Sequence, residues 1–523
     1  MRQLGVALLA GTALCLLAGP VSARVVLVGI DGGSWNVVDP LLEAGELPNL
    51  ASIARDGVSA DLETVEPVTS PVVWTSIATG RRPDAHGVTD FFATTLDVAV
   101  PTVFERLSAR GLRVGLYDYL MTWPPVNLEG GFVIPGWLRR DPTVTPPDVW
   151  SRIPLDPWTN AYEPLKTSED YRRNAMTEIR VKAERWNALA RAFDLDVGAV
   201  SFYAVDGTSH RFWHGAYPDA FEPEIAALAS DVGRTAIADA WRGIDRQLGE
   251  IRSALGPDDT ILVVSDHGFR AKGDAADVWV SHFDEVREKV APDLGPNGFQ
   301  ILTQFGQLVL RVHPGEFEAA ERTTVALAGF LESWQNDEGD GLFWAAEVLD
   351  VAERPEGHER SLANRLWQWL LRTVLEVVFH VELDPNQHAV VLAVPRGGVL
   401  SALAPDDPVK VGDTTLPLRE VFSRQVFTGD HDPIGIFLAA GGPIVPSAER
   451  GRISVLDVAP MIFHLAGAPV PDDLEGRVPE GWLPPPRIVP ASEMPGIARD
   501  PGSGTAPTDP DLIEKLRRLG YIE

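Results

Sequence analysis

Residues 25–33, VVLVGIDGG, begin with six nonpolar residues and end in an acidic, glycine-rich turn. A short apolar run of this kind is typical of a strand that is buried on both faces of a parallel sheet. Further strands are predicted at residues 113–117, 200–205 and 261–264. Between the last two, apolar residues recur every three or four positions from Ile237 to Leu255, which predicts an amphipathic helix. Strands alternating with helices indicate an α/β fold, with a mostly parallel central sheet and helices on both faces.

The rest of the chain predicts a core that is interrupted once. A short helix is expected at residues 48–56, ended by Gly57, and the core pattern returns with a strand at 435–439 and a helix at 458–465. In the intervening insertion the alternation of short apolar strands and amphipathic helices becomes less regular, which favours a mixed α+β cap. Its Trp-rich helix, residues 361–379, is expected to pack against the main domain rather than to lie on a membrane. The predicted division is 1–23 leader, 24–280 first part of the core, 281–419 insertion or cap, 420–480 second part of the core, and 481–523 Pro-rich tail with a short helix at 511–519.

The first 23 residues predict a secretory signal peptide. Arg2 is followed by an apolar run at residues 6–18, and the segment ends at Ala23 in a small-x-small pattern. We therefore expect export to the periplasm or the extracellular space. Cys15, the only cysteine, lies within this leader. After cleavage, any metal site must consist of histidines and carboxylates.

The net charge of −29 constrains the partners. Such a surface repels nucleic-acid backbones and anionic lipids, so no nucleic-acid binding is expected and membrane association is not required. A small anionic substrate would need a local positive centre, which bound metal ions supply. The sequence does not define the oligomeric state.

Three aspartates follow predicted strands: Asp31, Asp206 and Asp266. The carboxyl ends of strands in an open α/β sheet form its ligand-binding edge. A single aspartate there is commonly just a turn residue. However, His210 follows Asp206 at helical spacing, and His267 follows Asp266 directly. Three such acids, two with a nearby histidine, indicate a metal cluster; His431, in Gly429-Asp430-His431, is a weaker candidate by itself.

Ser70 is the candidate nucleophile. Ser70 and Pro71 predict a helix N-cap and first helical position, and Gly80 predicts the end of that helix. Capping alone would explain the serine equally well. The functional interpretation adds that a helix N-terminus offers N–H groups to a phosphate oxygen, and that an adjacent metal activates the hydroxyl.

Taken together, these segments resemble the type I phosphodiesterase/nucleotide pyrophosphatase branch of the alkaline-phosphatase superfamily, and within it a bacterial and archaeal group of predicted phosphohydrolases. The resemblance implies an alkaline-phosphatase-like fold and spans residues 25 to about 477. Counting back from Thr79-Gly80 places the family nucleophile at Ser70, with Thr69 as the alternative. The matching segments, in the family's order, are residues 28–32, 70–71 with 79–88, 206–210, 265–268 and 429–431.

The resemblance also implies a two-metal mechanism. One divalent ion would be bound by Asp31, Ser70, Asp266 and His267, and the other by Asp206, His210 and His431. The nitrogen and oxygen ligands suit zinc, with manganese as the alternative. Two ions roughly 3.5–4 Å apart stabilise the attacking and leaving oxygens of an in-line displacement. A small phosphate ester would thus transfer its phosphoryl group to Ser70, and water would then hydrolyse the phosphoseryl intermediate. His86 is expected to support its loop.

Two departures from related patterns keep alternatives open. The nucleotide pyrophosphatases carry an asparagine where this chain has Phe91, so the phosphoryl oxygen lacks that donor. Arg81 or Arg82 could replace it, but solvated surface charges are slightly favoured. A sulfatase is disfavoured because Thr69 and Val73 stand where formylglycine formation needs Cys or Ser and Arg. A phosphodiesterase or pyrophosphatase leads, ahead of a phosphomonoesterase or headgroup transferase with the same site, and of a catalytically silent envelope binding protein.

Overall fold

The computed structural model describes residues 23–139, 141–157, 167–294, 299–303, 308–312, 317–350 and 389–497. Three predicted features fall outside these ranges: the Trp-rich helix at 361–379, the tail helix at 511–519, and all of the leader except Ala23. Among the described helices, none is both long and apolar enough to cross a membrane.

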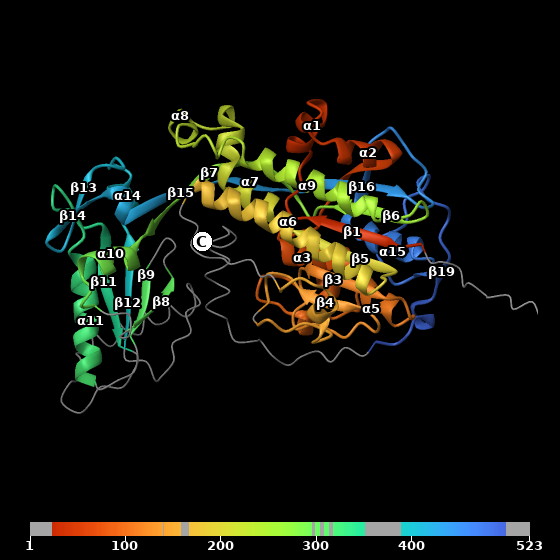
Figure 1. Ribbon diagram of the computed structural model, residues 1–523, viewed down its shortest axis with the longest axis horizontal. Helices are drawn as coiled ribbons and strands as arrows, with labels where there is room; N and C mark the ends of the chain where they lie inside the picture. The colour runs from red at the N-terminus through yellow and green to blue at the C-terminus, as the bar shows by residue number, and fades with distance from the viewer. Residues whose placement is uncertain are drawn as a thin grey trace, which may run out of the picture.

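One large sheet organises the chain. Its eight strands lie in the order β17-β2-β16-β6-β1-β5-β3-β4 (Figure 1). All neighbouring strands are parallel except β16, which runs antiparallel to both β2 and β6. The predicted mostly parallel α/β sheet is therefore confirmed. The strands are β1 (Val25–Ile30), β2 (Gly57–Glu63), β3 (Val114–Tyr119), β4 (Phe132–Pro135), β5 (Val197–Phe202), β6 (Thr260–Val264), β16 (Ile434–Gly441) and β17 (Gly451–Ser454).

Each face of this sheet is covered by helices and has its own core. Along β1, Val25 and Leu27 belong to one core, whereas Val26, Val28 and Ile30 belong to the other, as strand alternation requires. The predicted stripe of α9 is buried from Ile237 to Ile251. Each buried aliphatic side chain of this kind contributes about 1.5–3 kcal/mol, so the stripe determines which helix face meets the sheet. The covering helices are α3 (Ser70–Thr79), α5 (Val103–Ser108) and α15 (Val458–Leu465) on the first face, and α1 (Trp35–Glu43), α2 (Pro48–Asp56), α6 (Ser168–Ala192), α7 (Ala204–Ala216) and α9 (Ala236–Ser253) on the second.

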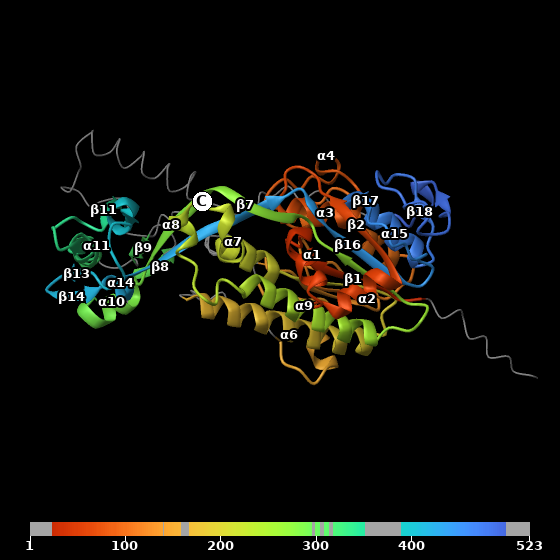
Figure 2. The same ribbon diagram turned by 90° about the horizontal axis from the view of Figure 1, so that it is seen from above.

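A two-stranded ribbon connects the large lobe to a smaller one. β7 (Gly268–Ser281) and β15 (Phe422–Asp432) pair antiparallel and extend away from the main sheet (Figures 1 and 2). The small lobe has its own apolar core, from Trp279 to Phe422. The described residues of the predicted insertion, 281–419, lie in this lobe, and the domain boundaries stay a prediction. Its elements are α10 (Phe283–Val290), α11 (Phe317–Glu332), α13 (Gly397–Leu400), α14 (Leu418–Val421), and the sheets β11-β12-β9-β8 and β10-β13-β14.

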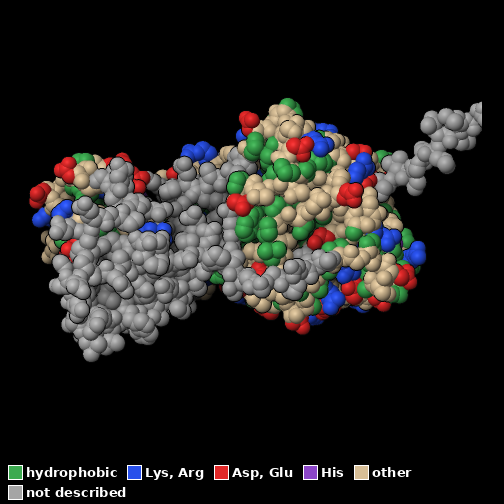
Figure 3. Space-filling model, turned by 90° about the horizontal axis from the view of Figure 1, so that it is seen from below, with side chains coloured by type: hydrophobic (Ala, Val, Ile, Leu, Met, Phe, Trp, Pro, Cys, Tyr) green, Lys and Arg blue, Asp and Glu red, His purple; other side chains and the backbone are tan. Residues whose placement is uncertain are grey.

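The strands of the small lobe are β8 (Phe299–Thr303), β9 (Leu308–Val312), β10 (Gln335–Asn336), β11 (Phe343–Asp350), β12 (Ala389–Pro395), β13 (Pro408–Val411) and β14 (Thr414–Pro417). On the face of the large lobe shown in Figure 3, apolar side chains gather near the middle and charges of both signs surround them. Neither positive nor negative side chains predominate on the visible part of that face.

Two local predictions were wrong in detail. The strand expected at 200–205 ends at Phe202, and α7 already begins at Ala204. Val205 is buried in the helix as completely as it would be in a strand, so apolar composition alone could not separate the two states. Likewise Thr69, rather than Ser70, is the N-cap of α3, and Ser70 is its first helical residue.

A buried ion cluster supports the junction between β5 and α7. Lys182 of α6 is 1% exposed, and its Nζ lies 2.6 Å from Asp118 Oδ2 and 2.8 Å from Glu178 Oε1. It also donates to the Ser201 carbonyl, while the backbone N–H of Tyr203 donates to Glu178. These contacts hold the end of β5 against α6 and β3, and so hold the start of α7, the helix that carries Asp206.

We expect Lys182→Met to lower the free energy of unfolding by about 3–5 kcal/mol, because it leaves two carboxylates in a buried site without their cation. Urea denaturation followed by circular dichroism measures this change. The control is Lys289→Met, which removes a lysine that is 55% exposed and paired with Glu420 on the surface. Equal stability of the two variants would contradict a supporting role for the cluster.

Candidate active site

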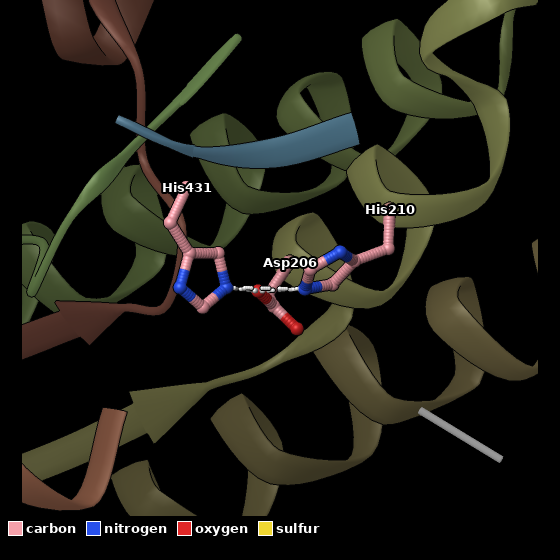
Figure 4. A group of neighbouring side chains, drawn as sticks. All are labelled: Asp206, His210 and His431. Atoms are coloured by element: carbon pink, nitrogen blue, oxygen red, sulfur yellow. Dashed lines mark hydrogen bonds and ion pairs between the residues drawn. The ribbon is translucent and has the colours of Figure 1, made fainter. Parts of the chain in front are cut away.

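Asp206, His210 and His431 converge from two different elements. Asp206 and His210 lie one turn apart in α7, as their spacing predicted, and His431 comes from β15 (Figure 4). His210 Nε2 lies 3.3 Å from Asp206 Oδ1 and 3.1 Å from His431 Nε2. His431 Nε2 lies 3.7 Å from the same Asp206 oxygen. Three ligand atoms therefore face one small volume.

Ser70 lies at the centre of the remaining residues. Its Oγ is 3.3 Å from Asp31 Oδ1, directly after β1, and 3.5 Å from His267 Nε2. That imidazole nitrogen is also 3.5 Å from Asp31 Oδ1 and 3.4 Å from Asp266 Oδ2. Asp31, Ser70, Asp266 and His267 are all fully buried. All seven candidate residues are thus gathered at the carboxyl edge of the large sheet.

All three histidines present the same nitrogen to the centre. The Nδ1 atoms of His210, His267 and His431 lie 3.1, 3.0 and 2.8 Å from the carbonyl oxygens of Gly429, Gly268 and Val68. A carbonyl only accepts hydrogen bonds, so each Nδ1 carries a proton and a neutral ring has its lone pair on Nε2. Metal-binding histidines are oriented in this way.

Three carboxylates are packed closely together in the buried centre. Burial, and then repulsion from Asp266 and Asp206, raises the pKa of Asp31 well above its usual value. Burial also raises the pKa of Asp266 to about 7, and Asp206 adds to this. For Asp206, burial opposes ionisation, but His210 and His431 outweigh it and lower the pKa. In the described part of the chain, no lysine or arginine forms an ion pair with any of the three acids.

These donors fit divalent metal ions. Two groups have ligand atoms mutually within 4.8 Å: Asp206 with His210 and His431, and Asp31 with Asp206 and His267. Asp266 Oδ2 is buried and makes no hydrogen bond to the described residues. Three buried acids facing three imidazole lone pairs need added positive charge, which nitrogen- and oxygen-binding cations provide. The structure brings the side chains of the second predicted set together, whereas near Asp31 and His267 of the first set it places Asp206 in the group and leaves Asp266 at its edge; that these residues bind metal stays a prediction.

The other residues singled out by the sequence have supporting positions. His86 is buried, lies 2.9 Å from Ser76 Oγ through Nε2, and accepts from the backbone N–H of Val88, as its expected structural role requires. Arg81 and Arg82 form ion pairs with Glu475, so both are engaged at the surface. His214, which lies one turn after His210 in α7 and is not one of the predicted ligands, bonds to Thr428 rather than to the cluster. Thr69 Oγ1 is buried beside Ser70, without a hydrogen bond to the described residues.

Several contributors to the site have no signal in the sequence. The Trp74 indole N–H donates to Asp31 Oδ2 at 3.1 Å, and the Gly32 N–H donates to Asp266 Oδ1 at 3.2 Å. Phe269 packs against the rings of His210, His267 and His431. Gly32 has φ +70°, and a Cβ there would lie 2.5 Å from Phe269. The spacing of Trp74, four residues after Ser70 on one helix, is the only hint that could have identified any of them.

Comparison with known proteins gives the family. The family model for type I phosphodiesterase/nucleotide pyrophosphatase matches residues 25–288. No curated protein sequence matches the chain. Similar solved structures include human ectonucleotide pyrophosphatase/phosphodiesterase 5 (13% identity, 85% of this chain and 95% of that chain, TM-score 0.37) and phosphonoacetate hydrolase from Sinorhizobium meliloti 1021 (15%, 86% and 96%, TM-score 0.38).

The family match covers β1, the Ser70 segment, Asp206 with His210, and Asp266 with His267. It leaves out His431, which reaches the same centre along β15. The chain belongs to the type I phosphodiesterase/nucleotide pyrophosphatase family and is a phosphoester hydrolase.

Proposed function

We propose that this protein is an exported, two-metal phosphodiesterase or pyrophosphatase that acts through a phosphoseryl intermediate on Ser70. The observation that carries this proposal is the convergence of three carboxylates and three imidazole Nε2 atoms around the Ser70 hydroxyl. Nothing in a purely structural helix cap requires such a concentration of buried acids beside it.

The residues present can hold two ions next to the nucleophile. Asp206, His210 and His431 would hold one, and Asp31 with His267 the other; Asp206 belongs to both groups, and Asp266 lies 3.4 Å from His267. Bound there, divalent ions would supply the positive charge that stabilises the attacking and leaving oxygens of a phosphoryl transfer. Zinc suits this set of ligands best, and manganese is the alternative.

The chain's own groups prepare Ser70 for attack. The Ser70 O–H donates to Asp31 Oδ1, so that carboxylate holds the proton and orients the oxygen. The Trp74 N–H fixes the second oxygen of Asp31 and thereby its orientation. Ser70 is also the first residue of a ten-residue helix, whose N-terminal N–H groups favour a phosphate oxygen.

The proposed reaction has two displacements. First, Ser70 Oγ forms a bond to phosphorus while the bond from phosphorus to the leaving oxygen breaks, and the leaving group departs as an alcohol or a phosphate. Second, a water oxygen bonds to the same phosphorus and the Ser70 Oγ–P bond breaks, which releases the phosphate product and restores the serine proton. Each step is an in-line substitution at phosphorus.

The position of Phe91 bears on the substrate. This side chain is buried and packs near Trp137, so its position contributes apolar surface in place of an amide donor. The N-terminal N–H groups of α3, where Ser70 is the first helical residue, would serve as donors to the phosphoryl oxygen instead. We expect the enzyme to hydrolyse simple diesters without a strong requirement for a nucleotide.

A metal-exchange assay tests the proposed function. The full chain is treated with a chelator, dialysed, and assayed with bis-(p-nitrophenyl) phosphate and with p-nitrophenyl phosphate. We expect chelation to abolish turnover, zinc to restore it better than magnesium, and the diester to be the better substrate. Restoration by magnesium alone would overturn the choice of metal. A preference for the monoester would favour the phosphomonoesterase alternative, and no hydrolysis with any metal would favour the silent binding protein.

Export is supported by the surroundings of Arg24. Its backbone N donates to Asp259 Oδ1 at 2.7 Å, and its Nε lies 2.9 Å from Asp259 Oδ2. Cleavage after Ala23 would turn that backbone N into a charged amino terminus already facing a carboxylate, which favours the cleaved form. We expect N-terminal sequencing of the secreted protein to begin at Arg24, and Asp259→Asn to lower the melting temperature of the mature protein. An intact leader on protein recovered from the cytoplasm would contradict export.

A further inference from the structure

A second pocket lies where α6, α7 and β15 meet, away from the Ser70 centre. Its volume is about 140 Å³, room for four or five waters at about 30 Å³ each, and therefore for one small oxyanion. None of the described residues that line it is acidic, although the chain has a net charge of −29. Its polar lining consists mainly of Thr167, Ser168, Arg211, Ser230, Arg424 and Gln425.

Arg211 is the unusual member of this lining. The side chain is 4% exposed, and its guanidinium carbon lies 4.2 Å from the ring centre of Tyr171 and 4.8 Å from that of Phe427. Nη1 donates to the Gly207 carbonyl at 3.3 Å. Nε and Nη2 are buried and have no hydrogen-bond partner among the described residues. No described acid forms an ion pair with Arg211.

The neighbouring acids are already engaged. Glu169 pairs with Arg172, and Asp170 pairs with Arg173 while its carboxylate closes the capping box with Thr167 at the start of α6. Neither is therefore the counter-ion of Arg211. Thr167 and Ser168, at the start of the same helix, add hydroxyl groups to the pocket lining.

The two idle donors define what would fit. Nε–H and one Nη–H point along the same edge of a guanidinium and bind two oxygens of a carboxylate, phosphate or sulfate together. Stacking between two rings offsets only part of the cost of burying a cation. An anion that entered from the pocket and reached these two buried donors would complete the pairing.

We propose that this pocket is a second oxyanion site, in which Arg211 binds two oxygens of a phosphate-like group and Arg424 adds charge at the rim. Arg211 follows His210 directly, and consecutive helical residues point about 100° apart around the axis. The two neighbours thus serve different sites on two sides of α7. The inference does not depend on the proposed catalytic mechanism, because it uses none of the residues around Ser70.

Inorganic phosphate is the probe that tests this proposal, using the metal-loaded full chain. Isothermal titration of the wild-type protein should reveal a phosphate site that Arg211→Gln weakens by about 10- to 100-fold, the loss expected for a bidentate charged pair. Phosphate inhibition of hydrolysis reports the Ser70 centre separately, and that inhibition constant should not change. Arg211→Lys should recover only part of the affinity for phosphate, since lysine restores the positive charge but not the two parallel N–H donors of the guanidinium.

Two further variants keep the result decisive. Arg424→Gln changes an exposed side chain at the rim, is expected to fold normally, and should weaken phosphate binding severalfold. Arg452→Gln, which removes an exposed arginine of β17 that pairs with Glu63, is the matched control and should leave the isotherm unchanged. Identical isotherms for the wild type, Arg211→Gln and Arg424→Gln would overturn the proposal.

A second experiment decides whether the phosphate group in the pocket belongs to the substrate or is free inorganic phosphate. The kcat/KM for a diester that carries an additional terminal phosphate is compared with that of its dephosphorylated analogue, in the wild type and in Arg211→Gln. A preference that disappears in the variant assigns the pocket to a distal group of the substrate. Phosphate binding that is lost without any change in this preference assigns it to free phosphate.

Discussion

Ser70→Ala is expected to reduce turnover of a phosphodiester by about 10⁴- to 10⁶-fold while the metal content stays unchanged. The reason is that Ser70 Oγ supplies the bond to phosphorus, whereas the carboxylates and imidazoles around it remain in place. Initial rates with a nitrophenyl diester, together with elemental analysis of the same preparation, measure both quantities. A second readout is the trapping of radioactive phosphate on the wild-type chain after acid quenching, which the variant should lose.

Two variants of neighbouring residues control for general damage to the α3 helix. Ser76→Ala removes a buried hydroxyl of the same helix that bonds to His86 and not to the cluster, so it should retain most of the activity. Thr69→Ala removes the buried hydroxyl directly before Ser70. If Thr69→Ala were inactive and Ser70→Ala active, the nucleophile would be Thr69; if both stayed active, a water molecule would be the nucleophile.

Asp206→Asn is expected to have a comparably large effect, but through metal binding. Asp206 belongs to both groups of converging ligand atoms, so its neutral isostere should weaken both ions. We expect the metal content to fall from about two ions per chain to less than one. Loss of the several kcal/mol that metal ions contribute to the transition state predicts a fall in kcat/KM of about a thousandfold.

The matched control for that variant is Asp245→Asn. Asp245 is also buried, but it accepts hydrogen bonds from Asn49 and the Leu50 N–H, where it joins α9 to α2. This substitution should lower the melting temperature and leave the metal content unchanged. If both aspartate variants retained full metal content and activity, the ligand role of Asp206 would be refuted.

The fold was predictable from the sequence where the spacing of apolar residues and the residues at the segment ends indicate the same element. β1 matches the predicted residues 25–30, and the helices at 48–56 and 458–465 have the predicted bounds, because these segments combine a clear period with Pro or Gly boundaries or a sharp polar turn. The end of β5 was misplaced because Ala204 and Val205 continue an apolar run into a helix that is equally buried. Short apolar segments carry no period by which strand and helix can be told apart.

The acids and histidines that converge in the candidate site were predictable from the sequence, but the groups that orient them were not. Asp206 and His210 are four residues apart, a spacing that places them on one side of a helix, and both do lie in one helix, α7. The groups that orient the imidazoles are backbone carbonyls of Val68, Gly268 and Gly429, and any residue type supplies a carbonyl. His431 reaches Asp206 only because β15 pairs with β7 across more than 140 residues, which no local pattern encodes. Arg211 likewise could not be identified from the sequence, because what distinguishes it is that its Nε and Nη2 have no hydrogen-bond partner among the described residues.

The most direct test of the paired-cation centre is anomalous X-ray diffraction at the zinc absorption edge, from crystals of the wild-type chain loaded with zinc. Two peaks are predicted, one among Asp206, His210 and His431 and one beside Asp31, His267 and the Ser70 hydroxyl. Crystals of active protein that show no peak among these residues, or zinc bound only elsewhere on the chain, would contradict the account.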